Sequence, residues 1–231
     1  MELLKCINID KSYDDKKILK NINLTIPRGK IIGILGKNGS GKTTLIKLMN
    51  DLLTPTNGEI LVNGKKVGVE SKKVISYLPE RSYLNKNLTV LETIKYFEDF
   101  YENFDTKKAN KLLKDLKLDI NQKISKMSKG MQEKVALVLV MSRKAELYIL
   151  DEPLGGVDPA TRDYILDTIL TNFDKDASVI ITTHIIQDVE RILDEVIFIN
   201  EGKIILTSDS DELRNKEKGS IDEIFRRMFK C

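Results

Sequence analysis

The chain has 231 residues, of which 41% are hydrophobic and 32% charged, enough apolar material for one sizeable core and too much for a disordered tail. Lys and Arg number 38 against 35 Asp and Glu, which gives a net charge of +3, and no basic run is interleaved with aromatic residues. Nucleic acid is therefore not an expected partner. Cys6 and Cys231 lack the spacing of a disulfide framework or a zinc site, which fits a reducing compartment.

The sequence offers no membrane span. Its most apolar stretch, residues 135–141, lies between Lys134 and Arg143. That stretch is far shorter than the roughly 20 residues of a spanning helix, so we expect a buried helix there. The N-terminus has an acid at position 2 and no long apolar run, so no signal peptide is predicted.

Short apolar segments alternate with helical patterns, which predicts a mainly parallel sheet. We expect its strands at residues 31–35, 75–78, 147–150, 179–182 and 196–199. Residues 60–62 and 204–206 flank Asn-Gly and Glu-Gly turns, which favour antiparallel hairpins. These two segments are expected to form a β-lobe.

The strand signal disappears between residue 80 and about residue 143. Thr89 and Glu92 have the spacing of a capping box, which predicts a helix from residue 90 to about 100. A second helix should place four apolar residues on one face: Ala109, Leu112, Leu113 and Leu116. The segment is therefore expected to be an inserted helical lobe.

Two later patterns also predict helices. Asp158 followed by Pro159 is typical of a cap and first turn. Near the end of the sequence, a stripe at helical spacing is expected to pack back onto the body of the protein; it consists of Ile221, Ile224, Phe225 and Met228.

A glycine-rich loop follows the expected strand 31–35 and precedes a helical pattern. Glycines let backbone N–H groups converge on phosphates, and the free N–H groups of a helix N-terminus favour anions. In such a loop Lys42 reaches the terminal phosphates and the Thr43 hydroxyl binds Mg²⁺. The predicted phosphate-binding residues are Gly36, Lys37, Asn38, Gly39, Ser40, Gly41, Lys42, Thr43 and Thr44.

Asp151 and Glu152 follow the apolar strand expected at 147–150 and precede Pro153. A buried strand that ends in two carboxylates delivers both to the edge of an open α/β sheet where active sites gather. The alternative interpretation is a strand that simply ends in a turn. His184, the only histidine, similarly follows the expected strand 179–182; a lone histidine is more often a packed or surface residue than a catalytic one.

Ser128, Gly130 and Gln132 open a helical pattern between these motifs. Together with the phosphate loop, the Asp-Glu-Pro sequence and the turn at residues 155–158, this order resembles the ATP-binding subunit of an ABC transporter. The family usually has Leu-Ser-Gly-Gly-Gln here; Met127, Lys129 and Met131 replace its first, third and fifth members. The resemblance covers nearly the whole chain.

The resemblance implies a role for each matching residue. Asp151 would hold Mg²⁺ through water, Glu152 would be the general base, and His184 would contact the γ-phosphate and orient the attacking water. Tyr13 would stack on adenine, although a tyrosine that merely ends a strand is the alternative. Lys42 would complete the catalytic set.

The signature segment and the turn after it are implied to act across a dimer. Ser128 and Gly130 would bind the γ-phosphate of ATP held by another subunit. The turn that ends at Asp158 would let the two sites sense each other. Glu80 stands where the family most often has glutamine and could bind Mg²⁺; its extra charge could strengthen metal binding or slow hydrolysis.

The implied fold is α/β, a phosphate-loop NTPase core of the ABC ATPase type with a mainly parallel sheet, an antiparallel β-lobe and an inserted helical lobe. Residues 1–231 would form one domain, with a core of 1–79 and 144–231 and a helical subdomain of 80–143. Some aromatic residues of the helical insert would fill its core and a minority would face a partner; they are Tyr96, Phe97, Phe100, Tyr101 and Phe104.

The implied function is ATP hydrolysis coupled to transport, with ATP and Mg²⁺ as cofactors. Partners would be an integral membrane permease in a separate chain and a second ATPase subunit, identical or different, in an ATP-sandwiched dimer on the cytoplasmic face of the membrane. The variant signature resembles exporters of peptides, antibiotics or lipid-like compounds. The alternatives are a soluble ABC ATPase, such as one of iron–sulfur cluster assembly, and a module that holds ATP without hydrolysing it; Glu152 and His184 argue against the latter.

Overall fold

The computed structural model describes residues 2–155, 158–174 and 176–229. Its centre is a six-stranded sheet in the order β10-β9-β3-β8-β7-β6. The strands from β9 to β6 are parallel, and β10 is antiparallel to β9. The predicted parallel strands are confirmed at β3 (Ile31–Leu35), β6 (Ile75–Leu78), β7 (Leu147–Asp151), β8 (Ser178–Thr183) and β9 (Glu195–Asn200).

The β-lobe is a separate antiparallel sheet in the order β2-β1-β4-β5. It consists of β1 (Glu2–Tyr13), β2 (Lys16–Pro27), β4 (Asn57–Val62) and β5 (Lys65–Lys66). The assignment of residues 204–206 to this lobe is wrong. Strand β10 (Lys203–Asp209) does form an antiparallel hairpin, but its partner is β9, so it lies at the edge of the central sheet.

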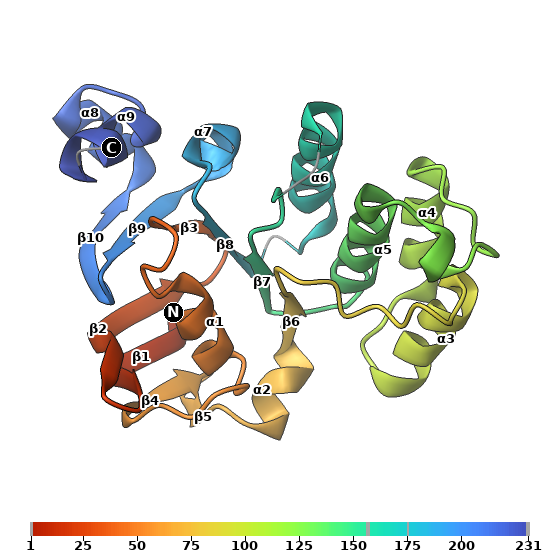
Figure 1. The fold of residues 1–231 in the computed structure, drawn as a ribbon, viewed down its shortest axis with the longest axis horizontal. Coiled ribbons are helices and arrows are strands. Elements are labelled where there is room, and N and C mark those ends of the chain that lie inside the picture. Colours follow the sequence, from red (N-terminus) through yellow and green to blue (C-terminus); the bar gives the residue numbers. More distant parts are fainter. Residues whose placement is uncertain (1, 156–157, 175, 230–231) are drawn as a thin grey trace.

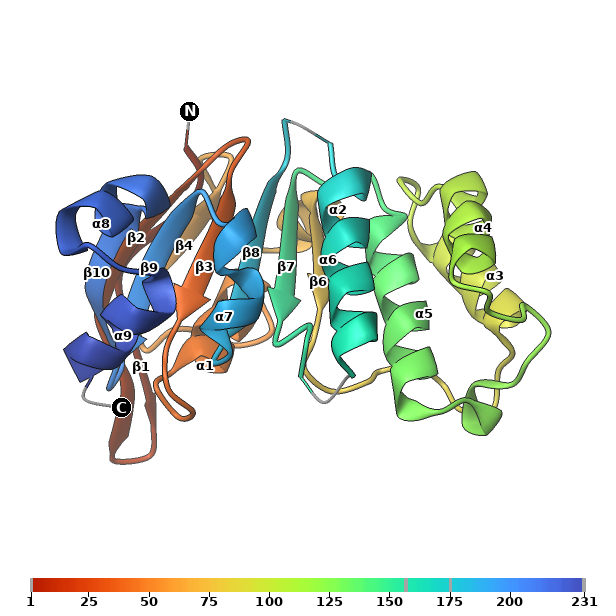
Figure 2. The same ribbon diagram turned by 90° about the horizontal axis from the view of Figure 1, so that it is seen from above.

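Helices cover both faces of the central sheet, and α3 and α4 gather at the end of the molecule opposite α8 and α9 (Figures 1 and 2). The α-helices are α1 (Lys42–Met49), α2 (Val69–Val74), α3 (Val90–Phe100), α4 (Thr106–Asp115), α5 (Lys129–Met141), α6 (Pro159–Asn172), α7 (Ile186–Val189), α8 (Ser210–Glu217) and α9 (Ile221–Phe229). Short 3₁₀ turns occur at η1 (Ile124–Lys126) and η2 (Glu190–Ile192). No helix in the described ranges is both long and apolar enough to cross a bilayer.

The start of α3 shows why these residues form a helix. Thr89 Oγ1 accepts from the Glu92 N–H at 3.2 Å, and the Glu92 carboxylate accepts from the Thr89 N–H at 2.7 Å, which confirms the capping box. In α4 the predicted apolar face is buried. The side chains of residues 135–141 in α5 are all buried, as expected from the apolar stretch.

Alternate residues of the buried strands point to opposite faces, so the central sheet separates two apolar cores. Ile32 and Ile34 belong to the core shared with the β-lobe and α1, whereas Ile31 and Leu35 face the core shared with α5 and α6. Helix α9 packs on the latter through Ile221, Ile224 and Phe225, as expected. Met228 is 43% exposed, so its place in the buried stripe is a wrong prediction.

Candidate active site

The phosphate loop connects β3 to α1 at the carboxyl end of the central strands. Gly41 has a φ of 108°, a conformation that only glycine adopts without strain, and it directly precedes the helix. A side chain at Gly36 would approach the carbonyl oxygen of Ile199 to 2.4 Å, so this position also requires glycine. The loop therefore folds tightly and leaves the first N–H groups of α1 without helical partners.

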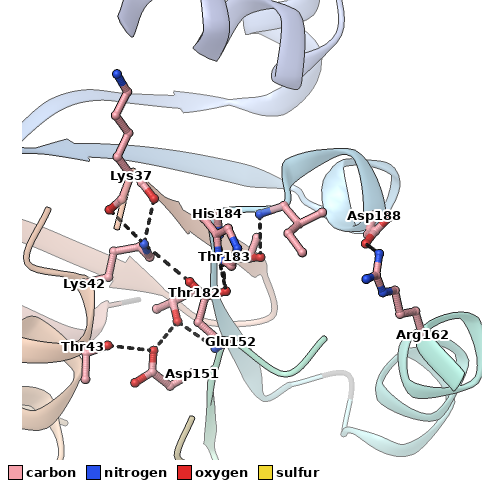
Figure 3. Close-up of polar contacts among 12 residues, drawn as sticks. Lys37, Lys42, Thr43, Asp151, Glu152, Arg162, Thr182, Thr183, His184 and Asp188 are labelled. Carbon is pink, nitrogen blue, oxygen red and sulfur yellow. Dashed lines mark hydrogen bonds and ion pairs between the residues drawn. The ribbon is translucent and has the colours of Figure 1, made fainter. Parts of the chain in front are cut away.

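Lys42, the first residue of α1, is only 5% exposed and curls back into the loop. Its Nζ donates to the carbonyl oxygens of Gly36 at 2.7 Å and Lys37 at 3.3 Å and lies 3.5 Å from Glu152 Oε1 (Figure 3). Burial lowers the pKa of Lys42, while Glu152 raises it. The ammonium group thus sits among acceptors at the place where the loop would hold phosphates.

Asp151 ends β7 beside the phosphate loop and is 1% exposed. Its Oδ1 accepts from Thr182 Oγ1 at 2.5 Å and from Thr43 Oγ1 at 3.4 Å. Its Oδ2 is buried and has no hydrogen-bond partner in the described part of the chain. Burial raises the pKa of Asp151, and the nearby charges of Glu152 and Glu80 raise it further.

Glu152 leaves the strand with a φ of 50°, which is uncommon for a residue with a Cβ. Its N–H donates to the carbonyl oxygen of Thr182 at 3.0 Å and to Thr182 Oγ1 at 3.1 Å, so β8 holds this turn in place. Its Oε2 lies 2.9 Å from His184 Nδ1 (Figure 3). The carboxylate therefore lies between Lys42 and His184, and the unusual backbone conformation of Glu152 directs the side chain to that position.

A cavity of about 640 Å³ is lined by Lys42, Glu152 and His184, whereas Asp151 is not among the described residues that line it. The predicted site residues that line it are Tyr13, Asn38, Gly39, Gly41, Lys42, Thr43, Thr44, Glu80, Glu152 and His184. Lys16 and Ile18 also line it and were not predicted, because they come from the β1–β2 hairpin, which contains no recognised motif. Thr182, which holds Asp151, was likewise missed; a polar residue at the end of a buried strand was the available signal.

Other predicted residues lie elsewhere. The Lys37 side chain points away from Lys42 (Figure 3) and donates to the Phe229 carbonyl oxygen at 3.0 Å, while Ser40 is buried. Ser128 caps α5 by accepting from the Met131 N–H at 3.3 Å. The cavity lining in the described ranges does not include Ser128, Gly130 or Asp158. Gly156 and Val157 of the predicted sensing turn lie outside the described residues.

Lys129, by contrast, lines the cavity of its own chain and pairs with Glu133 at 3.6 Å. Asp158 caps α6, since its carboxylate accepts from the N–H and hydroxyl of Thr161 at 3.0 and 2.7 Å. These hydrogen bonds lower the pKa of Asp158. The two cap residues Ser128 and Asp158 thus start neighbouring helices outside the cavity.

The oxygen atoms at the cavity suit Mg²⁺. Thr43 and the exposed Glu80 line the cavity, and Asp151, whose Oδ2 is unpaired among the described residues, is buried next to Thr43. Within the described ranges no three His, Cys, Asp or Glu residues lie close enough to hold a metal by themselves. Because Mg²⁺ usually combines one or two protein oxygens with phosphate oxygens and water, the residues fit a cation that arrives with a nucleotide.

Comparison with known proteins identifies the family. A model of the ABC transporter family matches residues 19–155. The lantibiotic transport ATP-binding protein SrtF of Streptococcus pyogenes is 30% identical over 217 residues, which cover 94% of this chain and 95% of SrtF. The SkfA peptide export ATP-binding protein SkfE of Bacillus subtilis (strain 168) is 32% identical over 211 residues, 89% of this chain and 88% of SkfE.

The structural likeness extends over the whole fold. A solved ATP-binding subunit of an ABC transporter superposes with a TM-score of 0.88 at 27% sequence identity and covers 98% of this chain and 99% of its own. The sequence motifs, the residues of the cavity and these relatives all indicate the same family. The chain belongs to the ABC transporter family and is an ATP-binding subunit, an ATPase whose hydrolysis of ATP powers transport.

Proposed function

We propose that this chain drives an exporter of peptide, antibiotic or lipid-like cargo. ATP hydrolysis by this chain is supported by the position of Glu152. In one cavity, its carboxylate lies 3.5 Å from the Lys42 ammonium and 2.9 Å from the His184 imidazole. The export part is supported by SkfE, whose name describes peptide export, and by SrtF, whose name describes lantibiotic transport. Fold and motor chemistry alone do not specify cargo.

In the proposed mechanism, Lys42 and the N–H groups of the phosphate loop bind the β- and γ-phosphates of ATP. Tyr13 contacts the adenine, and Thr43, Asp151 and Glu80 provide oxygens for Mg²⁺, which would neutralise phosphate charge. Glu152 accepts a proton from the attacking water, and His184 orients that water and contacts the γ-phosphate. The Thr182 hydroxyl positions Asp151 through the 2.5 Å hydrogen bond.

The working unit is proposed to be a dimer with two ATP molecules at its interface. Ser128 and Gly130 lie outside the cavity of their own chain, and Ser128 caps the free N-terminus of α5. A helix N-terminus with a hydroxyl group is suited to bind the γ-phosphate held by a second subunit, identical or different. Asp158, at the start of α6, would contact that subunit and relay its state.

The permease is proposed to dock beside the helical subdomain, residues 80–143 of a single 1–231 domain. An apolar groove of about 550 Å³ lies between α1, β6 and α3; its lining includes Leu52, Tyr77, Phe97, Phe100 and Tyr101. Tyr96 and Phe100 are 60% and 65% exposed, whereas Phe97 and Phe104 pack against the core. Docking there would hold the ATPase at the cytoplasmic face of the membrane.

Turnover by the protein reconstituted with its permease tests the catalytic proposal. Glu152→Gln should lower kcat at least about 100-fold, the lower range for losing a general base. Glu195→Gln is the matched control, because Glu195 begins β9 at the end of the sheet away from the cavity. Equal rates for wild type and Glu152→Gln would overturn the assignment.

Affinity purification from detergent-solubilised membranes tests the permease proposal. The wild-type protein should recover a multi-span membrane protein, and a Tyr96→Ser/Phe100→Ser variant should lose it. Met228→Ser is the control, because Met228 is exposed and belongs to α9, which lies at the opposite end of the molecule from α3 (Figure 1). Recovery of soluble assembly proteins alone would favour the soluble ATPase and leave the catalytic proposal intact.

A further inference from the structure

The first turn of α6 connects Asp158 rigidly to Arg162. Asp158 caps the helix, and the Arg162 N–H donates to the Asp158 carbonyl oxygen at 3.0 Å. The two residues therefore belong to one hydrogen-bonded turn, and a displacement of Asp158 moves the backbone of Arg162 with it.

An ion pair joins this turn to the segment that follows His184. Arg162 Nη1 lies 2.7 Å from Asp188 Oδ2, and each side chain is only 27% exposed (Figure 3). Asp188 belongs to α7, which is fixed in the core by Ile186 and Val189 with 1% and 0% exposure. Partial burial and the short distance make this contact stronger than an ordinary surface pair.

The other end of the same segment holds the catalytic contact. His184 lies two residues before α7, and its backbone N–H and Nδ1 lie 3.4 and 2.9 Å from Glu152 Oε2. The His184 side chain is 41% exposed, so packing does little to hold it. Its position depends mainly on where α7 places its backbone and on Glu152.

We propose that Arg162 and Asp188 are positioning residues: their ion pair sets the distance between His184 and Glu152 and links that distance to the α6 turn that begins at Asp158. The proposal rests on the proposed roles of Glu152 and His184. In the proposed dimer, a contact made at Asp158 would thereby reach the His184 of the same chain without passing through the phosphate loop.

The chain supplies a matched control. Arg191 Nη2 and Asp163 Oδ1 form a second ion pair between η2 and α6 at 3.1 Å, but these side chains are 58% and 70% exposed. Both pairs line one shallow groove of about 300 Å³. Breaking the second pair therefore removes the same kind of contact between α6 and the continuous stretch of α7 and η2.

The test measures kcat and the KM for ATP in the permease-reconstituted complex, and thermal stability, for Arg162→Met, Asp188→Asn and the exchanged variant Arg162→Asp/Asp188→Arg. We expect the single variants to lower kcat about five- to twentyfold, as for a displaced catalytic group, with KM within about twofold. The exchanged pair should recover at least about half of the lost activity. Arg191→Met and Asp163→Asn should change kcat by less than about twofold.

The imidazole NMR signals provide a readout that needs no turnover, because His184 is the only histidine. Arg162→Met should shift these signals, and Arg191→Met should leave them in place. Unchanged signals and unchanged kcat in Arg162→Met, or equal effects of the two ion pairs, would overturn the proposal. The Glu152→Gln variant, which keeps Arg162 and Asp188, tests the catalytic proposal separately. If it hydrolyses ATP as fast as the wild type, the catalytic proposal fails, whatever the ion-pair variants do.

Discussion

Two buried cations, Lys42 in the candidate active site and Arg143 at the start of the segment that follows α5, have different surroundings. They are 5% and 4% exposed, and burial lowers the pKa of both. Arg143 donates to the carbonyl oxygens of Ile75, Lys72 and Lys73 at 2.7, 3.0 and 3.1 Å. It also donates to Asn103 Oδ1, and its guanidinium carbon lies 3.9 Å from the centre of the Tyr101 ring.

The surroundings of Lys42 are less complete. Two carbonyl oxygens accept from it, a carboxylate lies at 3.5 Å, and the neighbouring Asp151 retains a buried oxygen without a partner in the described residues. Buried polar atoms are usually satisfied, and a buried carboxylate oxygen without a partner is open to an ion or a ligand. Arg143 is therefore a structural cation that joins the insert to β6, whereas the longest of the three Lys42 contacts, at 3.5 Å from Glu152, is one that a ligand could replace.

The largest effect should appear when Lys42 is replaced by methionine. The loop would keep its glycines and lose its only buried ammonium group, so we expect ATP affinity to fall at least about 100-fold, as for the loss of a buried charge-assisted contact with phosphate. Titration calorimetry measures this directly. Lys47→Met, an exposed position on the same helix, should change the affinity by less than about twofold. Similar losses in both variants would indicate a general charge effect.

Replacing Arg143 should lower the stability of the fold more than replacing Lys42. Arg143→Met removes the side-chain donor from the Ile75 and Lys72 carbonyl oxygens and breaks the bond to Asn103, so we expect it to lower the free energy of unfolding by about 3 kcal/mol. Lys42→Met should change it by less than about 1 kcal/mol, because desolvation already offsets the Lys42 contacts. Denaturant unfolding without nucleotide measures both, with the exposed Lys144→Met as the control. An equal loss in the Lys42 and Arg143 variants would contradict the distinction.

The sequence predicted the central sheet and the capped helices well, because their signals are local. It missed the long hairpin of β1 and β2, whose register is interrupted by several shifts between Glu2 and Ser12. Such bulges break the strict alternation by which strands are recognised. The spacing of the apolar residues predicted α9 correctly. Periodicity alone does not show which of these residues contacts the rest of the protein, and Met228 is exposed.

In the candidate site, too, some residues were predictable from the sequence and others were not. The motif residues around Lys42, Asp151 and Glu152 were predictable, since each motif carries its own chemical pattern. The roles of Thr182 and Arg143 were not predictable, because their hydrogen-bond partners lie far away in the sequence. Lys16 was missed because the β1–β2 hairpin contains no recognised motif. The contact between Glu152 and His184 depends on the register that pairs Asp151 with Thr182 across β7 and β8.

The smallest effect concerns Asp151 and depends on pH. Burial raises its pKa in the folded protein above the ordinary value of 3.8, so the folded state binds this proton more tightly than the unfolded state. Asp151 therefore costs no stability well below pH 3.8, and its cost grows as the pH rises from 3.8 to its folded pKa and is constant above that. Asp151→Asn removes that cost while keeping the shape. Without nucleotide, its advantage over wild type in unfolding free energy should grow from near zero at low pH to about 1 kcal/mol at neutral pH. Unfolding curves from pH 4 to 7 measure this difference. A difference that stays constant with pH would mean that the Thr182 and Thr43 hydroxyls already compensate the buried charge, and that the site is as complete as the one around Arg143.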